Sequence, residues 1–220
     1  MNVNFSIVLE YWPVLLRGLG MTVAITMTCA LVGSLAGFIL SLARTSGNRM
    51  LSYPASLYVE FFRGTPLLIQ LFWVFFCFPI VLGLSVAPIV SVCIALILYM
   101  AAITCETFRG ALKSISSDQY DACTALGLSA GVRVTYVIFP QALLRAIPPL
   151  LSNVISLFKE SALISSVGIA DLMFVGQNLS NSTARPIEFL TAVALIYFVV
   201  AFPLTRLVGW VERRMLRRFS

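Results

Sequence analysis

Residues 64–105 contain no charged side chain, and this stretch restricts the fold of the chain more than any other feature. One membrane-spanning helix needs roughly 20 mostly apolar residues, so the stretch is too long for a single helix. A glycine and a proline within residues 82–88 favour a turn at its centre. We therefore predict two spanning helices here, over residues 66–82 and 88–105.

Three further apolar stretches, over residues 18–43, 148–168 and 189–208, predict the remaining spans. Hydrophobic residues make up 60% of the chain and charged residues only 11%, which lies far outside the range of a soluble domain. The expected fold class is all-α. We expect the chain to be a polytopic membrane protein with five transmembrane helices in one domain over residues 1–220.

Twelve of the fifteen basic residues lie on alternate loops of this arrangement. Three are in residues 44–63, four are in the large polar loop over residues 106–147, and five lie from Arg206 to the end. The opposite side carries only Arg17 and Arg185. By the positive-inside rule, the N-terminus faces out, while the large loop and the C-terminus face the cytoplasm. Membrane orientation therefore explains the net charge of +6, and no nucleic-acid partner is expected.

The histidine, lysine and cysteine content of the chain argues against an enzyme. The chain has no histidine, which removes histidine-containing catalytic triads and histidine metal sites. Neither Lys113 nor Lys159 follows a glycine, so the chain has no phosphate-binding loop of the Walker A type. The five cysteines are scattered and are interpreted as small packing residues. No catalytic residue, metal or bound cofactor is expected, and an intramembrane enzyme using Lys159 beside Ser161 is the least favoured alternative.

The polar loop carries its own helix signals. Ser116 and Gln119 fit a capping box, which predicts a helix start. Gly127 suits the left-handed position that ends a helix, and Ser129 can cap a second short helix that runs to Pro140. An apolar stripe at spacings of three lies on the first helix: Tyr120, Cys123 and Leu126. The spacing alone is equally consistent with a docking helix and with an ordinary helix-turn-helix on a cytoplasmic loop.

Part of this loop resembles the EAA motif of ABC-transporter permeases, written E-A-A-x3-G-x9-I-x-L-P. The matching residues are Asp121-Ala122-Cys123, Gly127 and the Val-Ile-Phe-Pro of residues 137–140, with Gly127 and Pro140 in register. The copy departs from the motif at four places, with Asp for Glu, Cys for Ala, Val for Ile and Phe for Leu. The resemblance implies a coupling helix that docks in a groove on an ATPase subunit through six residues: Asp121, Ala122, Cys123, Leu126, Gly127 and Pro140.

Further segments are similar to the polar amino acid branch of these permeases: residues 58–72, 106–110, 140–143, 148–150 and 159–163. The resemblance implies a five-span subunit of the bacterial inner membrane that pairs with an identical or related second permease subunit. It also implies two ABC ATPase subunits that bind ATP and Mg, an extracytoplasmic solute-binding protein, and a polar amino acid as substrate. The alternative is an ion-driven secondary transporter of small polar solutes, although such proteins often contain internal repeats and none is found here.

Two pairs of opposite charges are spaced three residues apart, Glu60 with Arg63 and Glu106 with Arg109. Each pair is expected to form a salt bridge at the cytoplasmic end of a helix, with a role in gating as the alternative. As exposed pairs they would contribute only about 0 to 1 kcal/mol each.

Lys159 and Glu160 lie inside the fourth predicted span, where a charge costs roughly 2.5 to 3.5 kcal/mol or more unless it is paired or wetted. Adjacent helical residues point about 100° apart, so the two side chains are poorly placed to neutralise each other. We expect at least one of them to line the substrate path, with Asn153 as a weaker candidate. Pairing with another helix or with the partner subunit is the alternative.

Overall fold

The computed structural model describes residues 4–83 and 85–216, and every regular element in them is helical. The elements are α1 Ser6–Glu10, α2 Trp12–Thr45, α3 Arg49–Gly64, α4 Leu67–Phe72, η1 Trp73–Cys77, α5 Phe78–Leu82, α6 Pro88–Lys113, α7 Ser117–Ala125, α8 Ala130–Val132, η2 Arg133–Ile138, α9 Phe139–Glu160, η3 Ser161–Val167, α10 Leu172–Thr183 and α11 Pro186–Leu216. Of these, η1 and η2 are π-helices and η3 is a 3₁₀ helix.

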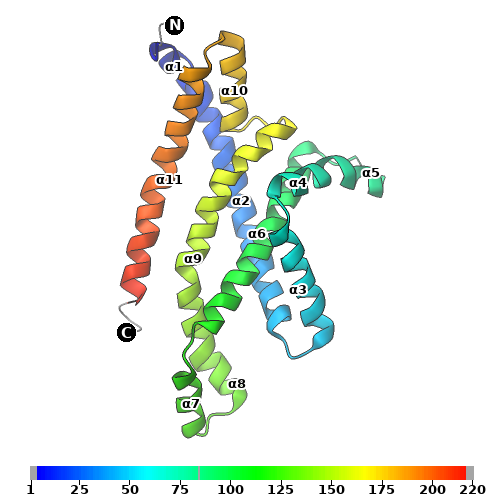
Figure 1. Cartoon of the computed structure of the whole chain (residues 1–220), viewed down its shortest axis with the longest axis vertical. Helices are drawn as coiled ribbons and strands as arrows, with labels where there is room; N and C mark the ends of the chain where they lie inside the picture. The colour runs from blue at the N-terminus through cyan, green and yellow to red at the C-terminus, as the bar shows by residue number, and fades with distance from the viewer. Residues whose placement is uncertain (1–3, 84, 217–220) are drawn as a thin grey trace.

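Long helices form the body of the molecule (Figure 1). α1 lies at one end and α7 and α8 lie at the other, while α11 runs from the α1 end toward the α7 end. The described part of the chain therefore begins at the α1 end of the bundle, and α11 finishes part of the way toward the α7 end. Arg217 and Arg218, two of the basic residues counted after Arg206, lie outside the described residues.

The all-α fold with several membrane-spanning helices is confirmed, and the described residues contain four candidate spans, or five if one bent helix pair is counted as a span. Four segments are long and apolar enough to cross a membrane: Trp12–Thr45, Pro88–Lys113, Ala130–Val167 and Pro186–Met215. A fifth span is obtained when Arg49–Gly64 and Leu67–Leu82, which meet at a bend of 107°, are counted as one. The predicted span over residues 66–82 is therefore one arm of a broken helix.

A close helix contact in the core joins α2 to α6 through two glycines. A Cβ atom added at Gly33 would lie 2.7 Å from the Cβ of Met100, and one added at Gly37 would lie 2.5 Å from the carbonyl oxygen of Ala101. Both distances are too short for carbon, so only glycine allows this approach. Around it lies the main buried cluster, which includes Cys29 and Leu96.

The bend between α3 and α4 is held by one buried side chain. Pro66 has no N–H, so the carbonyl of Phe62 cannot receive its ordinary helical hydrogen bond from that position. The Nε2 group of Gln70 takes this place, donating to the carbonyl of Phe62 at 2.8 Å and to the carbonyl of Thr65 at 2.9 Å. Gln70 is only 5% exposed, so it fastens the end of α3 to the start of α4.

Replacing Gln70 with Met is expected to loosen this bend. Methionine has a similar length but no donor, so the carbonyls of Phe62 and Thr65 lose their partner, at about 1–3 kcal/mol. Thermal unfolding of the detergent-solubilised chain should show a lower midpoint, by about 2–4 °C per kcal/mol. Ile69→Met, at the exposed neighbouring position, is the matched control and should leave the midpoint unchanged. Equal midpoints for both variants would contradict the role of Gln70.

Candidate functional site

The short helix α7 begins where the sequence predicted, but not through the predicted contact. Ser116 occupies the N-cap position with extended backbone, yet its hydroxyl makes no capping hydrogen bond. The side chain of Gln119 turns instead toward α9, where its Oε1 accepts a hydrogen bond from Nε2 of Gln141 at 3.1 Å. The capping-box contact was therefore a wrong prediction, and Gln119 ties α7 to the following long helix.

The end of α7 follows the sequence signals closely. Gly127 has φ +69°, the left-handed conformation that glycine adopts without strain. The N–H of Leu128 donates to the carbonyl of Cys123 at 3.0 Å, which closes the last turn. The hydroxyl of Ser129 then caps α8 by accepting from the N–H of Val132 at 3.4 Å.

The second short helix does not end at Pro140, which corrects the prediction. α8 passes into the π-helix η2, and η2 passes directly into α9. Pro140 lies directly after η2, at the second residue of α9, and its missing N–H removes one backbone hydrogen bond to the preceding turn. The chain from Ala130 to Val167 therefore forms one long helical segment that connects the loop to the bundle.

The residues that match the EAA motif are mostly exposed. Asp121, Ala122, Gly127 and Pro140 lie on the surface, and Leu126 is 75% exposed although it is apolar. Cys123 is buried, so within this chain it anchors α7 and offers no contact surface. The predicted stripe is therefore divided between an inward-facing part and an outward-facing tip.

Several contacts hold α7 firmly against its neighbours. A small apolar cluster of Ile115, Ile138 and Ala142 packs beneath it, with Tyr120 at its edge. The guanidinium of Arg133 lies 5.7 Å from the centre of the Tyr120 ring, within range for a cation–π interaction. The segment is thereby attached both to the end of α6 and to the start of α9.

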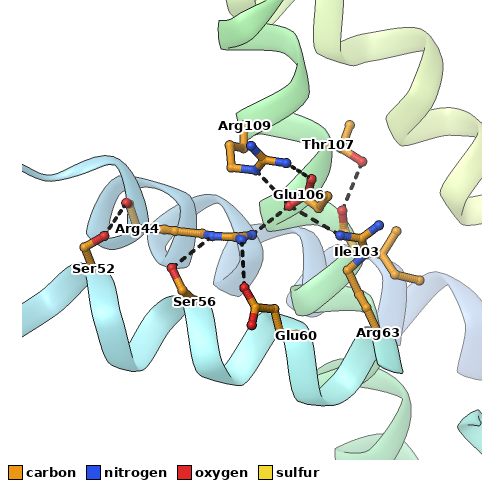
Figure 2. Close-up of polar contacts among 9 residues, drawn as sticks. All are labelled: Arg44, Ser52, Ser56, Glu60, Arg63, Ile103, Glu106, Thr107 and Arg109. Carbon is orange, nitrogen blue, oxygen red and sulfur yellow. Dashed lines mark hydrogen bonds and ion pairs between the residues drawn. The ribbon is translucent and has the colours of Figure 1, made fainter. Parts of the chain in front are cut away.

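A carboxylate surrounded by three arginines lies at the end of α6 nearest to this segment (Figure 2). The Oε2 of Glu106 is 2.7 Å from Nη1 of Arg44 on α2 and 3.4 Å from Nη1 of Arg63 on α3. Arg109, one turn further along α6, donates from Nε to the same oxygen at 2.9 Å and from Nη2 to Oε1. We call this set, Glu106 with Arg44, Arg63 and Arg109, the three-arginine cluster. It joins three helices at one charged group.

Arg44 is the central cation of the cluster and the one that sequence reasoning missed. Its side chain is only 12% exposed, and its Nε donates to the hydroxyl of Ser56 at 3.3 Å. The hydroxyl of Ser52 donates to the Arg44 carbonyl at 2.9 Å, so the α2–α3 corner closes around this residue. The only signal in the sequence was a basic residue at the end of an apolar span, which fits membrane orientation equally well.

The predicted Glu60–Arg63 pair does not form in the described part of the chain. Arg63 points to Glu106, while Glu60 is 71% exposed and lies 4.0 Å from Arg44. The spacing of three residues was satisfied, but each side chain has a partner on another helix. The Glu106–Arg109 contact, which has the same spacing, is present.

Lys159 and Glu160 lie beside a cavity of about 420 Å³, whose wall also includes Ser156 and Leu163. The hydroxyl of Tyr99 donates to Oε1 of Glu160 at 3.0 Å. Among the described residues, Oε2 of Glu160 is buried and has no hydrogen-bond partner. Glu160 therefore has one oxygen bonded to Tyr99 and a second, buried oxygen without a hydrogen-bond donor in the described part of the chain.

Asn153 does not belong to that cavity. Its Nδ2 donates to the hydroxyl of Thr107 at 2.8 Å, which links α9 to α6 one residue beyond Glu106. The Thr107 hydroxyl in turn donates to the carbonyl of Ile103 at 3.0 Å (Figure 2). The structure thus places Asn153 next to the three-arginine cluster, away from Lys159 and Glu160.

A buried carboxylate at the other end of the molecule was not predicted. Asp171 is fully buried and caps α10, accepting from the N–H of Phe174 at 2.8 Å. Burial raises the pKa of Asp171 to about 6, although hydrogen bonds from the backbone and from Tyr197 oppose this shift. An Asp directly before a helical stretch was the available sequence signal. Across residues 4–83 and 85–216 no group of three or more Cys, Asp or Glu side chains is placed to hold a metal ion.

The whole chain is similar to known permease subunits. It is 34% identical to the arginine transport system permease protein ArtQ of Bacillus subtilis over 215 residues, covering 98% of both proteins. It is 31% identical to the glutamine transport system permease protein GlnP of Escherichia coli, covering 98% of this chain and 99% of that protein.

Solved structures agree with this similarity. The crystal structure of an amino acid ABC transporter with histidines superimposes with a TM-score of 0.93 at 31% identity, covering 97% of this chain and 100% of that one. The inward-facing MetNI methionine ABC transporter superimposes with a TM-score of 0.77 at 21% identity, covering 94% of this chain and 98% of that one. The second likeness concerns the fold alone.

Fold and comparisons together define a membrane-spanning permease subunit of an ABC transporter, a multi-pass protein of the bacterial inner membrane. The chain belongs to the family of binding-protein-dependent transport system inner membrane components, whose model it matches over residues 30–217. Membership in this family argues against the ion-driven alternative.

Proposed function

We propose that this permease subunit imports polar amino acids and that a partner ABC ATPase drives it by docking on α7. The observation that carries the docking assignment is the exposed tip of α7. Leu126 is 75% exposed there, next to the left-handed Gly127. An apolar side chain on a polar loop, next to small residues, fits a groove on a second protein.

Movement of α7 is transmitted to the bundle through rigid contacts. At about 1.5 Å per residue, its nine residues span about 13 Å, which is too short to cross a bilayer but sufficient for a lever. The Gln119–Gln141 hydrogen bond and the contact of Arg145 Nη1 with the Ser114 carbonyl fasten the lever to α9 and α6. When ATP closes two ATPase subunits, the two coupling segments approach each other, and the spanning helices change between inward-facing and outward-facing arrangements.

The remaining partners follow from the same proposal. The end with α7 faces the cytoplasm, as the basic loops predict, and the N-terminus faces out. ATP and Mg²⁺ are bound by the ATPase subunits, a second identical or related permease subunit completes the path, and an extracytoplasmic binding protein delivers the amino acid. Family membership, the relatives and the superposition with an amino acid ABC transporter support this assembly.

Vesicle uptake distinguishes the proposed energy source from the alternative. The assembled transporter, with its ATPase and binding protein, should accumulate a polar amino acid when ATP is inside the vesicles, and a proton uncoupler should leave the initial rate unchanged. Uptake that stops on addition of the uncoupler, with ATP held constant, would contradict ATP-driven import. A panel of amino acids tested for binding to the partner binding protein identifies the substrate.

Lys159 and Glu160 are proposed to contact the substrate in the membrane. A zwitterionic amino acid presents an ammonium group, which suits the carboxylate of Glu160, and a carboxylate, which suits the ammonium of the exposed Lys159. Both groups line the same cavity. The two charges are then neutralised by the substrate when it is present.

Single replacement of Lys159 or Glu160 with Gln is expected to reduce substrate-stimulated ATPase activity about tenfold or more. A hydrogen bond to a charged group contributes about 1.5–3 kcal/mol, and 1.4 kcal/mol corresponds to a factor of ten. Ser152→Ala is the control on the same helix, because Ser152 is exposed and lies outside the cavity. Wild-type substrate affinity and stimulation in both glutamine variants would exclude the assignment.

A further inference from the structure

The exposed face of α3 joins two cavities that no step of the transport mechanism uses. The first, which we call the hydroxyl cavity, has a volume of about 560 Å³ and is lined by Arg49, Met50, Ser52, Tyr53 and Ser56. The second, the aromatic groove, has a volume of about 490 Å³ and lies inside the bend. It is lined by residues that include Phe61, Ile69, Trp73, Phe78, Ile94 and Leu98.

The hydroxyl cavity offers the groups that bind a phosphate. In the part of the chain that the structure describes, Arg49 is exposed and forms no ion pair. Tyr53 is 73% exposed, and the hydroxyl of Ser56, which accepts from Arg44, keeps its own proton free to donate. A guanidinium with two neighbouring hydroxyl donors suits an anionic oxygen-rich group.

The aromatic groove has the opposite character, because almost all of its wall is carbon. A continuous ridge at helical spacings of four connects it to the hydroxyl cavity. Tyr53, Leu57 and Phe61 form this ridge, and each is more than half exposed. At about 1.5 Å per residue, the ridge is about 12 Å long, which is close to the depth of one hydrocarbon leaflet.

We propose that this face of α3 is a binding site for one anionic phospholipid. The headgroup phosphate binds Arg49, Tyr53 and Ser56, the chains follow Leu57 and Phe61, and the end of one chain fills the aromatic groove. A positive headgroup site at Arg49 and an apolar chain site at this separation match a lipid, and Glu60, the exposed acid further along α3, lies next to Arg44. The proposal does not depend on which solute is transported.

Fluorescence of Trp73 tests the proposal directly, because its ring is part of the groove wall. Replacing Trp12 and Trp210 with Phe leaves Trp73 as the single tryptophan of the chain. This variant is reconstituted in two series of phosphatidylcholine vesicles. One series contains increasing mole fractions of chain-brominated phosphatidylglycerol, and the other contains the same mole fractions of chain-brominated phosphatidylcholine. Brominated phosphatidylglycerol should quench Trp73 at lower mole fractions than brominated phosphatidylcholine.

Charge variants then locate the headgroup. Arg49→Gln should weaken the preference for phosphatidylglycerol about fivefold, since one basic residue near an anionic surface contributes about 1 kcal/mol. Arg49→Lys should retain the preference, and Arg17→Gln, an exposed arginine at the other end of the molecule, should not change it. Equal quenching by both lipids, or a preference that survives Arg49→Gln, would overturn the proposal. Absence of quenching by either lipid would also overturn it, because protein from a second copy would then cover the groove.

Discussion

Replacing Glu106 with Gln is expected to lower the thermal unfolding midpoint of the solubilised chain by about 6–12 °C. The change leaves Arg44, which is 12% exposed, without its closest anion, and removes the charge shared with Arg63 and Arg109. Breaking a buried ion pair costs about 3–5 kcal/mol, and the value here lies near 3 because Arg63 and Arg109 are partly solvated. For a chain of this length, each kcal/mol corresponds to about 2–4 °C.

Glu60→Gln provides the matched control for this prediction. It removes the same charge next to the same arginine, but Glu60 is 71% exposed and lies at 4.0 Å. Exposed pairs contribute about 0–1 kcal/mol, so the midpoint should move by no more than about 4 °C. If the two variants unfold at the same temperature, the three-arginine cluster does not fasten α2 and α3 to α6 as described.

Replacing Gly127 with Asp is expected to leave the chain inserted in the membrane but to reduce co-purification of the partner ATPase about tenfold or more. The left-handed conformation of residue 127 costs a side-chain-bearing residue about 1–2 kcal/mol. A negative charge at a docked tip adds an unpaired group to the interface, and 1.4 kcal/mol already corresponds to a factor of ten. The measurement is the ATPase-to-permease ratio after affinity purification.

Two further variants separate conformation from charge at the α7 tip. Gly127→Asn is uncharged and tolerates the left-handed region, so most of the ATPase should still co-purify. Gly131→Asp introduces the same charge at a glycine without positive φ, so it should reduce co-purification less than Gly127→Asp. Wild-type stoichiometry in Gly127→Asp would argue that α7 is not the docking element.

Glu106 of the three-arginine cluster lies shortly before α7 in the sequence. Loss of the cluster is therefore also expected to affect the element on which we propose the ATPase docks. Glu106 lies about two turns before α6 ends at Lys113, and α7 begins at Ser117. Thr107, the next residue, holds Asn153 of α9. Helices α2, α3, α6 and α9 are therefore joined at one level, directly above the element that we propose the ATPase moves.

Short sequence patterns predicted the structure well where it depends only on residues close together in the sequence. The start of α7 after Ser116 and its end at Gly127 depend on backbone preferences of a few consecutive residues. The spans depend on uninterrupted apolar length. The Ser116 cap contact failed because Gln119 found a partner 22 residues away, which no local rule contains.

The ion pairs show more clearly what short sequence patterns fail to predict. Spacing of three predicted Glu60–Arg63 and Glu106–Arg109 equally, yet only the second pair forms. Because α3 packs against α6, Arg63 pairs with Glu106, while Glu60 stays exposed to solvent. Arg44, which also binds Glu106, lies 62 residues before it in the sequence, on α2. A local ion pair contributes so little that tertiary packing decides which partner is chosen.

The sequence by itself determined that this chain is a helical membrane protein with an amphipathic polar loop, because hydrophobic length and charge placement are summed along the chain and need no fold. Only the tertiary structure decided that one span is broken at Pro66 and held by Gln70, that Glu106 gathers three arginines, and that Asn153 lies away from Lys159 and Glu160. These features depend on which side chains meet across helices, and that is set by the close α2–α6 packing at Gly33 and Gly37.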